Sequence, residues 1–159
     1  MIKTIYRKII QGIESLCKVA LVIQVISTGI VVLGRQFFNK TPAWGEELTL
    51  LLMVWLSLIG AVVLLKEDGH IAVTSFDPKL PEKFIRITDL LSYLFLGLYG
   101  VFMLIYGISL VEITTLSILP GLRIKSSWLY TAVPVSSGML LLVVMDKIIR
   151  WFSHKEKEV

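Results

Sequence analysis

Charged residues and cysteine are both scarce in this sequence. Only 18% of its 159 residues are charged, 55% are hydrophobic, and Cys17 is its one cysteine. A soluble domain has about 25% charged and about 45–50% apolar residues, and at this length it keeps much of its surface in water. The high hydrophobicity excludes a disordered chain, and one cysteine excludes a disulfide-stapled fold. The composition therefore predicts a protein that uses lipid as a second solvent.

The sequence also lacks a single basic patch, although its net charge is +4. Its 16 lysine and arginine residues fall in clusters that apolar runs separate. A nucleic-acid-binding protein gathers such residues on one surface, so we expect no nucleic acid among the partners. We expect membrane lipid to contact the apolar runs instead.

Four long runs contain no charged residue. They are bounded by Lys18 and Arg35, by Glu47 and Lys66, by Asp89 and Glu112, and by Lys125 and Asp146. As helices they measure about 24, 27, 33 and 30 Å, against about 30 Å of bilayer hydrocarbon. They lack the alternation of polar and apolar residues that the strands of a membrane barrel need. We predict an all-α integral membrane protein, one domain over residues 1–159, with spans at about residues 17–38, 46–66, 84–111 and 127–149.

The residues ahead of the first span have a different pattern. Residues 2–16 repeat apolar side chains at helical spacing, with basic and polar side chains on the opposite face. They lack the continuous apolar core and the cleavage site of a signal peptide. We predict an amphipathic helix over residues 2–16 along the inner surface of the membrane, with packing on a partner protein as the alternative.

The distribution of positive charge predicts the orientation of the spans. Lysine and arginine gather on the cytoplasmic side of membrane proteins. Here 12 of them lie in the N-terminal segment, the second loop and the C-terminal tail, and 4 lie in the other two loops. We therefore expect both termini in the cytoplasm. Trp44 and Trp128 then mark the outer of the two membrane interfaces, and Trp151 marks the inner one.

The four runs also lack the charged and histidine side chains that ion transport or haem binding within a membrane needs. No charged residue lies inside them, whereas a self-sufficient pump for charged solutes keeps ionised groups at membrane depth. Gln24 is expected to pair with a neighbouring helix. His70 and His154 lie outside the runs, so they cannot ligate a haem within them. No metal-ligand spacing, phosphate loop or nucleophile–base pair is visible, and we expect no catalytic residue, metal or cofactor and no enzyme.

A set of short motifs begins with the second run. Its parts are Trp44-Gly45-Glu46-Glu47, Val54-Trp55, Ile59-Gly60-Ala61 and, in the loop that follows, Gly69-His70-Ile71-Ala72-Val73. With four spans and both ends inside, this set resembles the small membrane subunit (DctQ type) of tripartite ATP-independent periplasmic (TRAP) transporters. The resemblance extends to Ala132-Val133-Pro134-Val135 in the fourth run. Thr74 and the basic stretch over residues 122–128 depart from the family pattern.

The resemblance implies a role in transport. Such subunits pair with a large membrane subunit, which carries the substrate and sodium sites, while a soluble periplasmic binding protein delivers the substrate. By this resemblance we expect a non-catalytic scaffold subunit of a sodium-driven importer of organic anions, such as a C4-dicarboxylate, sialic acid or a similar carboxylate. The expected location is a bacterial inner membrane, in a heterodimer with the large subunit. The alternatives are a four-helix scaffold or assembly factor unrelated to transport and a small stand-alone exporter.

The resemblance implies that the motif residues contact the partner subunit. Each of them also has a structural interpretation. Trp44 suits a membrane interface, and Glu46 suits the positive end of a helix dipole. Glu47 lies nearer the apolar run, where facing lipid is unfavourable, so we predict that it bonds a polar partner within the chain or on the large subunit. Trp55 is expected to pack near mid-membrane, where its indole N–H needs an acceptor.

The remaining candidates lie farther along the chain. Gly60 and Ala61 let another backbone approach closely, as small residues do at helix contacts in lipid. His70 is expected to anchor its loop by a hydrogen bond, with pH sensing as the alternative. Arg123 and Lys125 are candidates for docking acidic residues of the binding protein, and the alternative is that they anchor their loop at lipid headgroups.

Overall fold

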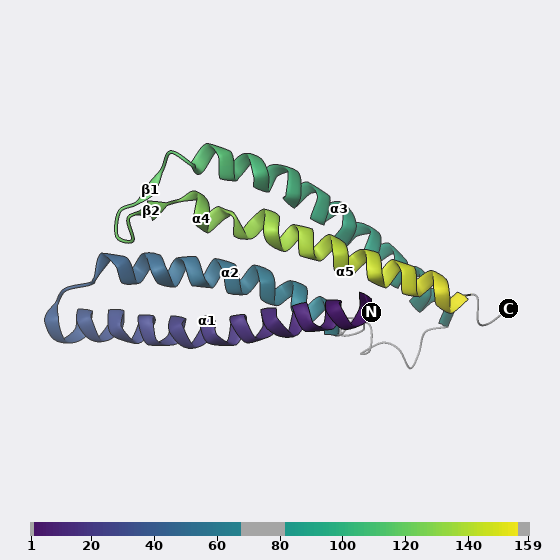
Figure 1. The fold of residues 1–159 in the computed structure, drawn as a ribbon, viewed down its shortest axis with the longest axis horizontal. Helices are drawn as coiled ribbons and strands as arrows, with labels where there is room; N and C mark the ends of the chain where they lie inside the picture. The colour runs from purple at the N-terminus through teal and green to yellow at the C-terminus, as the bar shows by residue number, and fades with distance from the viewer. Residues whose placement is uncertain (1, 68–81, 156–159) are drawn as a thin grey trace.

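The computed structural model describes residues 2–67 and 82–155, almost all of them helical (Figure 1). The long helices are α1 (Ile2–Phe38), α2 (Ala43–Glu67), α3 (Glu82–Thr114) and α5 (Ala132–Lys155). The one-turn helix α4 (Ser127–Tyr130) precedes α5, and strands β1 (Ile118–Leu119) and β2 (Ile124–Lys125) form an antiparallel pair between α3 and α4.

Four stretches of the described chain are long and apolar enough to cross a membrane. They are Gly12–Phe38, Ala43–Lys66, Ile87–Thr114 and Ser127–Ile149. The expectation of an all-α protein with four spans is therefore confirmed. The fourth span is divided between α4 and α5, because Pro134 has no N–H to give to the carbonyl of Tyr130 and its ring crowds that carbonyl.

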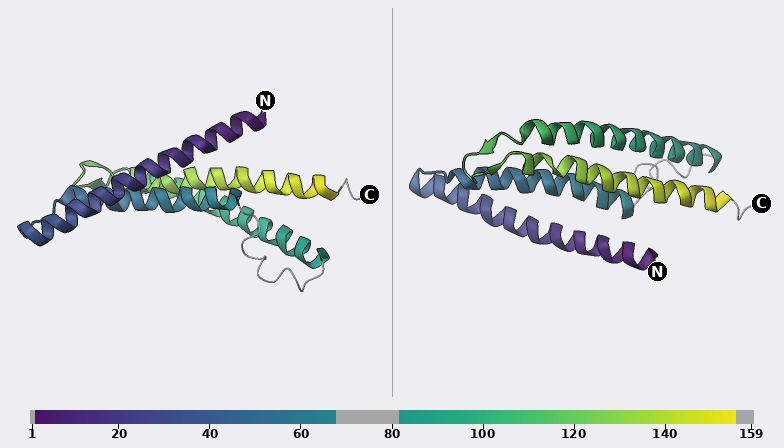
Figure 2. Two further views of the ribbon diagram at one scale, coloured as in Figure 1. Left: turned by 90° about the horizontal axis from the view of Figure 1, so that it is seen from below. Right: turned by 45° about the horizontal axis from the view of Figure 1, so that its top comes forward.

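The long helices lie side by side in the order α1, α2, α5, α3, as their packing and two views show (Figures 1 and 2). The helices α1 and α3 thus form the two edges of the layer. The start of α1 and the end of α5 lie at one end of the bundle, and the β1–β2 hairpin lies at the other (Figure 1). We refer to these as the terminal end and the hairpin end. An ion pair of Lys66 with Glu14, 4.0 Å from Nζ to Oε1, joins α2 to α1 near the terminal end.

The N-terminal segment differs from the expectation of a separate amphipathic helix. Residues 2–16 are helical, but they continue into the first span without a break as part of the 37-residue α1. The reason is local, because no proline interrupts residues 2–38 and no other feature ends the hydrogen-bond ladder. A helix of this length measures about 55 Å, so part of it extends beyond the hydrocarbon. A position of residues 2–16 along the inner surface stays a prediction.

The core lies where α2, α3 and α5 meet, on the side of the terminal end. Its buried residues are Val62, Tyr93, Leu140, Val143 and Val144. Two glycines of α3 bring that helix close to α5. A Cβ at Gly107 would lie 3.0 Å from Val133 Cγ1, and a Cβ at Gly100 would lie 3.0 Å from Leu141 Cδ2. Small residues permit such close helix packing in lipid, where no hydrophobic force drives helices together.

Candidate functional site

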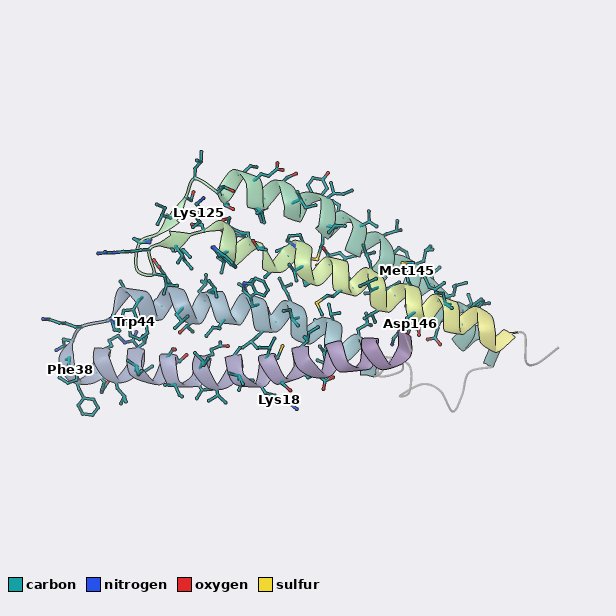
Figure 3. The ribbon with its side chains drawn as sticks, in the orientation of Figure 1. Lys18, Phe38, Trp44, Lys125, Met145 and Asp146 are labelled. Carbon is teal, nitrogen blue, oxygen red and sulfur yellow. The ribbon has the colours of Figure 1, made fainter. Side chains whose placement is uncertain are left out.

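The first turns of α2 and the β1–β2 hairpin form one unit at the hairpin end. The α2 helix begins at Ala43, just after Pro42, and the Gly45 N–H donates to the Pro42 carbonyl at 2.9 Å. The motif Trp44-Gly45-Glu46-Glu47 therefore occupies the first turns of the helix. Figure 3 shows Trp44 and Lys125 at this end of the bundle, together with Phe38 at the end of α1.

The Glu47 carboxylate fixes the hairpin to α2. Its Oε1 accepts the N–H of Gly121 at 2.9 Å, and its Oε2 accepts the N–H of Leu122 at 2.8 Å. Hydrogen bonds from N–H groups to an ionised carboxylate are about twice as strong as those between neutral groups. The polar partner expected for Glu47 thus lies within the chain, and we call this pair of bonds the carboxylate latch.

Gly121 makes the latch sterically feasible. A Cβ at this position would lie 2.5 Å from the carbonyl oxygen of Ala43 and 2.9 Å from the nitrogen of Trp44. Such contacts are with backbone atoms, which cannot rotate away. Gly121 does not have a positive φ, so glycine is needed here for space and not for conformation. The loop can therefore lie directly on the start of α2.

Gly45 serves a similar purpose on the opposite side of the same helix turn. It is buried, and a Cβ there would collide with the Val31 side chain of α1. The end of α1 is itself fixed by Asn39, which has a φ of 47°, and by a 3.4 Å bond from the Lys40 N–H to the Gly34 carbonyl. Asparagine tolerates this left-handed conformation, which often ends a helix. The first turns of α2 are thus held between α1 and the hairpin.

The hairpin itself is short and has a tight turn. Its strands pair Ile118 with Lys125 and Leu119 with Ile124, and the Ser126 N–H donates to the Ser117 carbonyl at 2.9 Å. Across the turn, the Arg123 N–H donates to the Leu119 carbonyl at 2.8 Å. The turn therefore presents residues 120–123 beyond the strands, where the latch holds its middle.

Arg123 has an unfavourable backbone conformation. Its φ of 56° lies in the left-handed region, which costs a residue other than glycine, asparagine or aspartate about 1–2 kcal/mol. The Arg123 and Lys125 side chains are both exposed, and no ion pair of either is found among the described residues. Strained residues of this kind cluster at functional sites. The hairpin thus displays two exposed cations, Arg123 in its turn and Lys125 in β2, and the latch fixes its backbone on α2.

A second bond ties α2 to the segment that follows the hairpin. The indole Nε1–H of Trp55 donates to the Trp128 carbonyl of α4 at 3.1 Å. The acceptor expected for Trp55 is therefore a backbone carbonyl in the interrupted fourth span. Sequence reasoning missed this carbonyl and Gly121, because neither position carries a side chain that signals its role. The break at Pro120-Gly121 predicts a turn but not the surface on which the turn rests.

The other sequence candidates take no part in the carboxylate latch. Glu46 is exposed in the first turn of α2, and Ala61 is exposed farther along the helix. Gly60 has no atom of another described element within 4 Å of the position of a Cβ, so its small size is not used inside the described chain. His70, with the Gly-His-Ile motif, lies outside the described residues. No group of three potential metal ligands occurs within the described part of the chain.

Comparison with known proteins agrees with the motifs. The family described as "Tripartite ATP-independent periplasmic transporters, DctQ component" matches residues 24–154. The chain is similar to the sialic acid TRAP transporter small permease protein SiaQ of Vibrio cholerae, with 29% identity over 89% of this chain and 83% of the relative. It is also similar to a putative TRAP transporter small permease protein of Haemophilus influenzae, with 26% identity over 88% of this chain and 85% of the relative.

A third relative has a different organisation. The sialic acid TRAP transporter permease protein SiaT of Haemophilus influenzae is 24% identical over 69% of this chain, but the match covers 18% of that protein. The region similar to this chain is therefore one part of a much longer permease polypeptide. The family match, the relatives and the four spans together indicate a multi-pass inner-membrane protein that is a transporter component and not an enzyme. The chain belongs to the DctQ component family of tripartite ATP-independent periplasmic transporters.

Proposed function

We propose that this chain is the small scaffold subunit of a TRAP importer and forms a heterodimer with a large permease subunit. The SiaT relative supports the pairing, because there a region similar to this chain shares one polypeptide with the remainder of a permease. The four spans support a static role, because their charged residues lie toward their ends and leave no ion path at membrane depth. In this role, substrate crosses the membrane through the large subunit.

The proposed substrate is an organic anion whose uptake is driven by sodium. Two relatives are named for sialic acid transport, which favours sialic acid or a similar carboxylate, with a C4-dicarboxylate as the next candidate. A soluble binding protein delivers this anion from the periplasm. Both termini are proposed to be cytoplasmic, because basic residues concentrate at the terminal end and in the loop after α2. The hairpin end then faces the periplasm.

The hairpin is the proposed docking surface for the binding protein. The observation that carries this proposal is the carboxylate latch, which fixes the hairpin that displays Arg123 in its turn and Lys125 in β2. A surface held in one conformation loses little conformational entropy when a partner binds. Two exposed cations also attract an acidic partner surface and raise its association rate.

Reconstitution in liposomes tests this function. We expect binding-protein-dependent uptake of a labelled carboxylate under an inward sodium gradient when this chain and the large subunit are both present. This chain alone should move no solute, and omission of either partner should abolish uptake. Uptake by this chain alone would indicate a stand-alone transporter, and full uptake by the large subunit and binding protein without this chain would contradict the scaffold role.

A further inference from the structure

The α1 edge of the layer has a polar feature within its membrane span. A surface groove of about 470 Å³ is lined by Leu21, Gln24, Val25 and Thr28, which lie along one face of α1. These residues belong to the middle of the span Gly12–Phe38. Leu21 and Val25 are 55% and 63% exposed. The groove is therefore open to whatever surrounds α1 in the membrane.

The Gln24 side-chain amide has no hydrogen-bond partner among the described residues. The Thr28 hydroxyl donates at 2.8 Å to the backbone carbonyl of Gln24 and does not contact the Gln24 side-chain amide with this bond. Hydrocarbon offers no donor or acceptor, and an unbonded amide in an apolar medium is strongly unfavourable. Hydroxyls elsewhere in the spans avoid this problem by bonding to their own helix. Ser57 donates to the Val54 carbonyl at 3.1 Å, and Ser109 donates to the Ile105 carbonyl at 3.4 Å.

The surroundings of α1 leave room for another helix at this point. The helix packs mainly on α2 and lies at the edge of the layer (Figure 2). Gly29, next to the groove, has no atom of another described element within 4 Å of the position of a Cβ. Small residues and amide side chains both favour contacts between helices in lipid. Both occur here on a helix with one main neighbour inside the chain.

We propose that a membrane-spanning helix of the large permease subunit occupies this groove and presents a hydrogen-bonding side chain to the Gln24 amide. The inference rests on the proposed pairing with that subunit and assigns a face to it. The large subunit is favoured over a second copy of this chain, because in the SiaT relative the similar region and the rest of the permease lie in one polypeptide. The helix in the groove would supply the donor and acceptor that lipid lacks.

Site-specific photo-crosslinking in membranes that contain both subunits tests the assigned face. A photoreactive residue at position 25 lies in the groove, and one at position 102 is the control, because Phe102 is 57% exposed on the α3 edge. We expect crosslinks to the large subunit from position 25 and not from position 102. Crosslinks to the large subunit from position 102 alone, crosslinks from position 25 to a second copy of this chain, or no protein crosslink from position 25 would each overturn the inference.

Substitution of the amide provides a second measurement. We expect Gln24→Leu to weaken the affinity of the two purified subunits roughly 3- to 30-fold, in keeping with one interhelical hydrogen bond. Ser57→Ala is the matched control and should leave the affinity unchanged, because Ser57 bonds within its own helix. Equal affinities of the Gln24→Leu and wild-type subunits would contradict the inference and leave the proposed function intact. If wild-type chain and large subunit form no complex, the proposed function fails and this inference fails with it.

Discussion

Glu47 and Gly121 are 74 positions apart in the chain, yet the Glu47 carboxylate accepts the Gly121 N–H at 2.9 Å. Its other oxygen accepts the next N–H of the same turn, that of Leu122. A carboxylate at the start of one span thereby determines where the turn before another span lies. The proposed docking role of the hairpin depends on this contact.

Glu47→Leu should detach the hairpin from α2. The change removes two charge-assisted hydrogen bonds and leaves two backbone N–H groups without an acceptor, at a cost of about 2–4 kcal/mol in folding stability. We expect a lower thermal unfolding midpoint of the detergent-solubilised complex and reduced binding-protein-dependent uptake. Glu47→Gln keeps an acceptor oxygen and should lie between the two. A Glu47→Leu subunit that assembles and transports like wild type would show that the latch has no role in docking.

Gly121→Ala should have a similar effect through sterics. The added methyl group would overlap the backbone of Ala43 and Trp44, and relieving such overlap costs about 1–3 kcal/mol. Gly138→Ala is the control, because a Cβ there meets no atom within 4 Å and alanine favours a helix. The two variants can be compared by thermal unfolding and by uptake. Equal behaviour of both would mean that the turn can move away from α2 without consequence.

Substitution of Arg123 separates the effect of backbone strain on hairpin stability from the effect of charge on docking. Arg123→Asn should stabilise the hairpin by about 1 kcal/mol, because asparagine tolerates the left-handed conformation. It should nevertheless weaken docking of the binding protein, because a cation is lost. Charge reversal of both Arg123 and Lys125 to glutamate should weaken docking more, and the defect should be largest at low ionic strength. The measurement is the affinity for the binding protein at two salt concentrations, and a defect independent of salt would count against an electrostatic role.

Trp55→Phe should loosen the contact between α2 and α4. Phenylalanine keeps most of the packing but cannot donate to the Trp128 carbonyl. We expect a loss of about 1–2 kcal/mol in stability, measured as a lower unfolding midpoint. Uptake should persist at moderate temperature, since the turn of the hairpin keeps its latch. If uptake falls while the unfolding midpoint is unchanged, Trp55 contributes to transport in another way.

The sequence predicts the spans well and the contacts between them poorly. Four charge-free runs determine the number of spans, because lipid admits few other arrangements of such residues. That Glu47 needs a polar partner also follows from its place beside an apolar run. The sequence does not identify this partner, because the partner is a backbone N–H group in a distant turn and backbone groups are the same for almost every residue type. The reason for glycine at positions 45 and 121 is seen only when the Val31 side chain is placed beside Gly45 and the Ala43 backbone beside Gly121.

The sequence pattern likewise does not show that residues 2–16 and the first span form one continuous helix, α1. The hydrophobic pattern indicates which faces of a helix are exposed to water and which to an apolar environment. Near residue 16 the sequence changes from an amphipathic to a uniformly apolar pattern. This pattern does not report a change in the direction of the backbone. A turn between the two segments needs a residue that ends the helix, and α1 has no proline.

The latch binds main-chain groups of the turn and no side chain of it. Apart from the glycine, whose space is needed, the amino acids displayed by the turn can therefore be exchanged while its position stays the same. For the proposed docking role, this means that the charges of the turn can change to suit another partner while the contact between the turn and the membrane helices is kept.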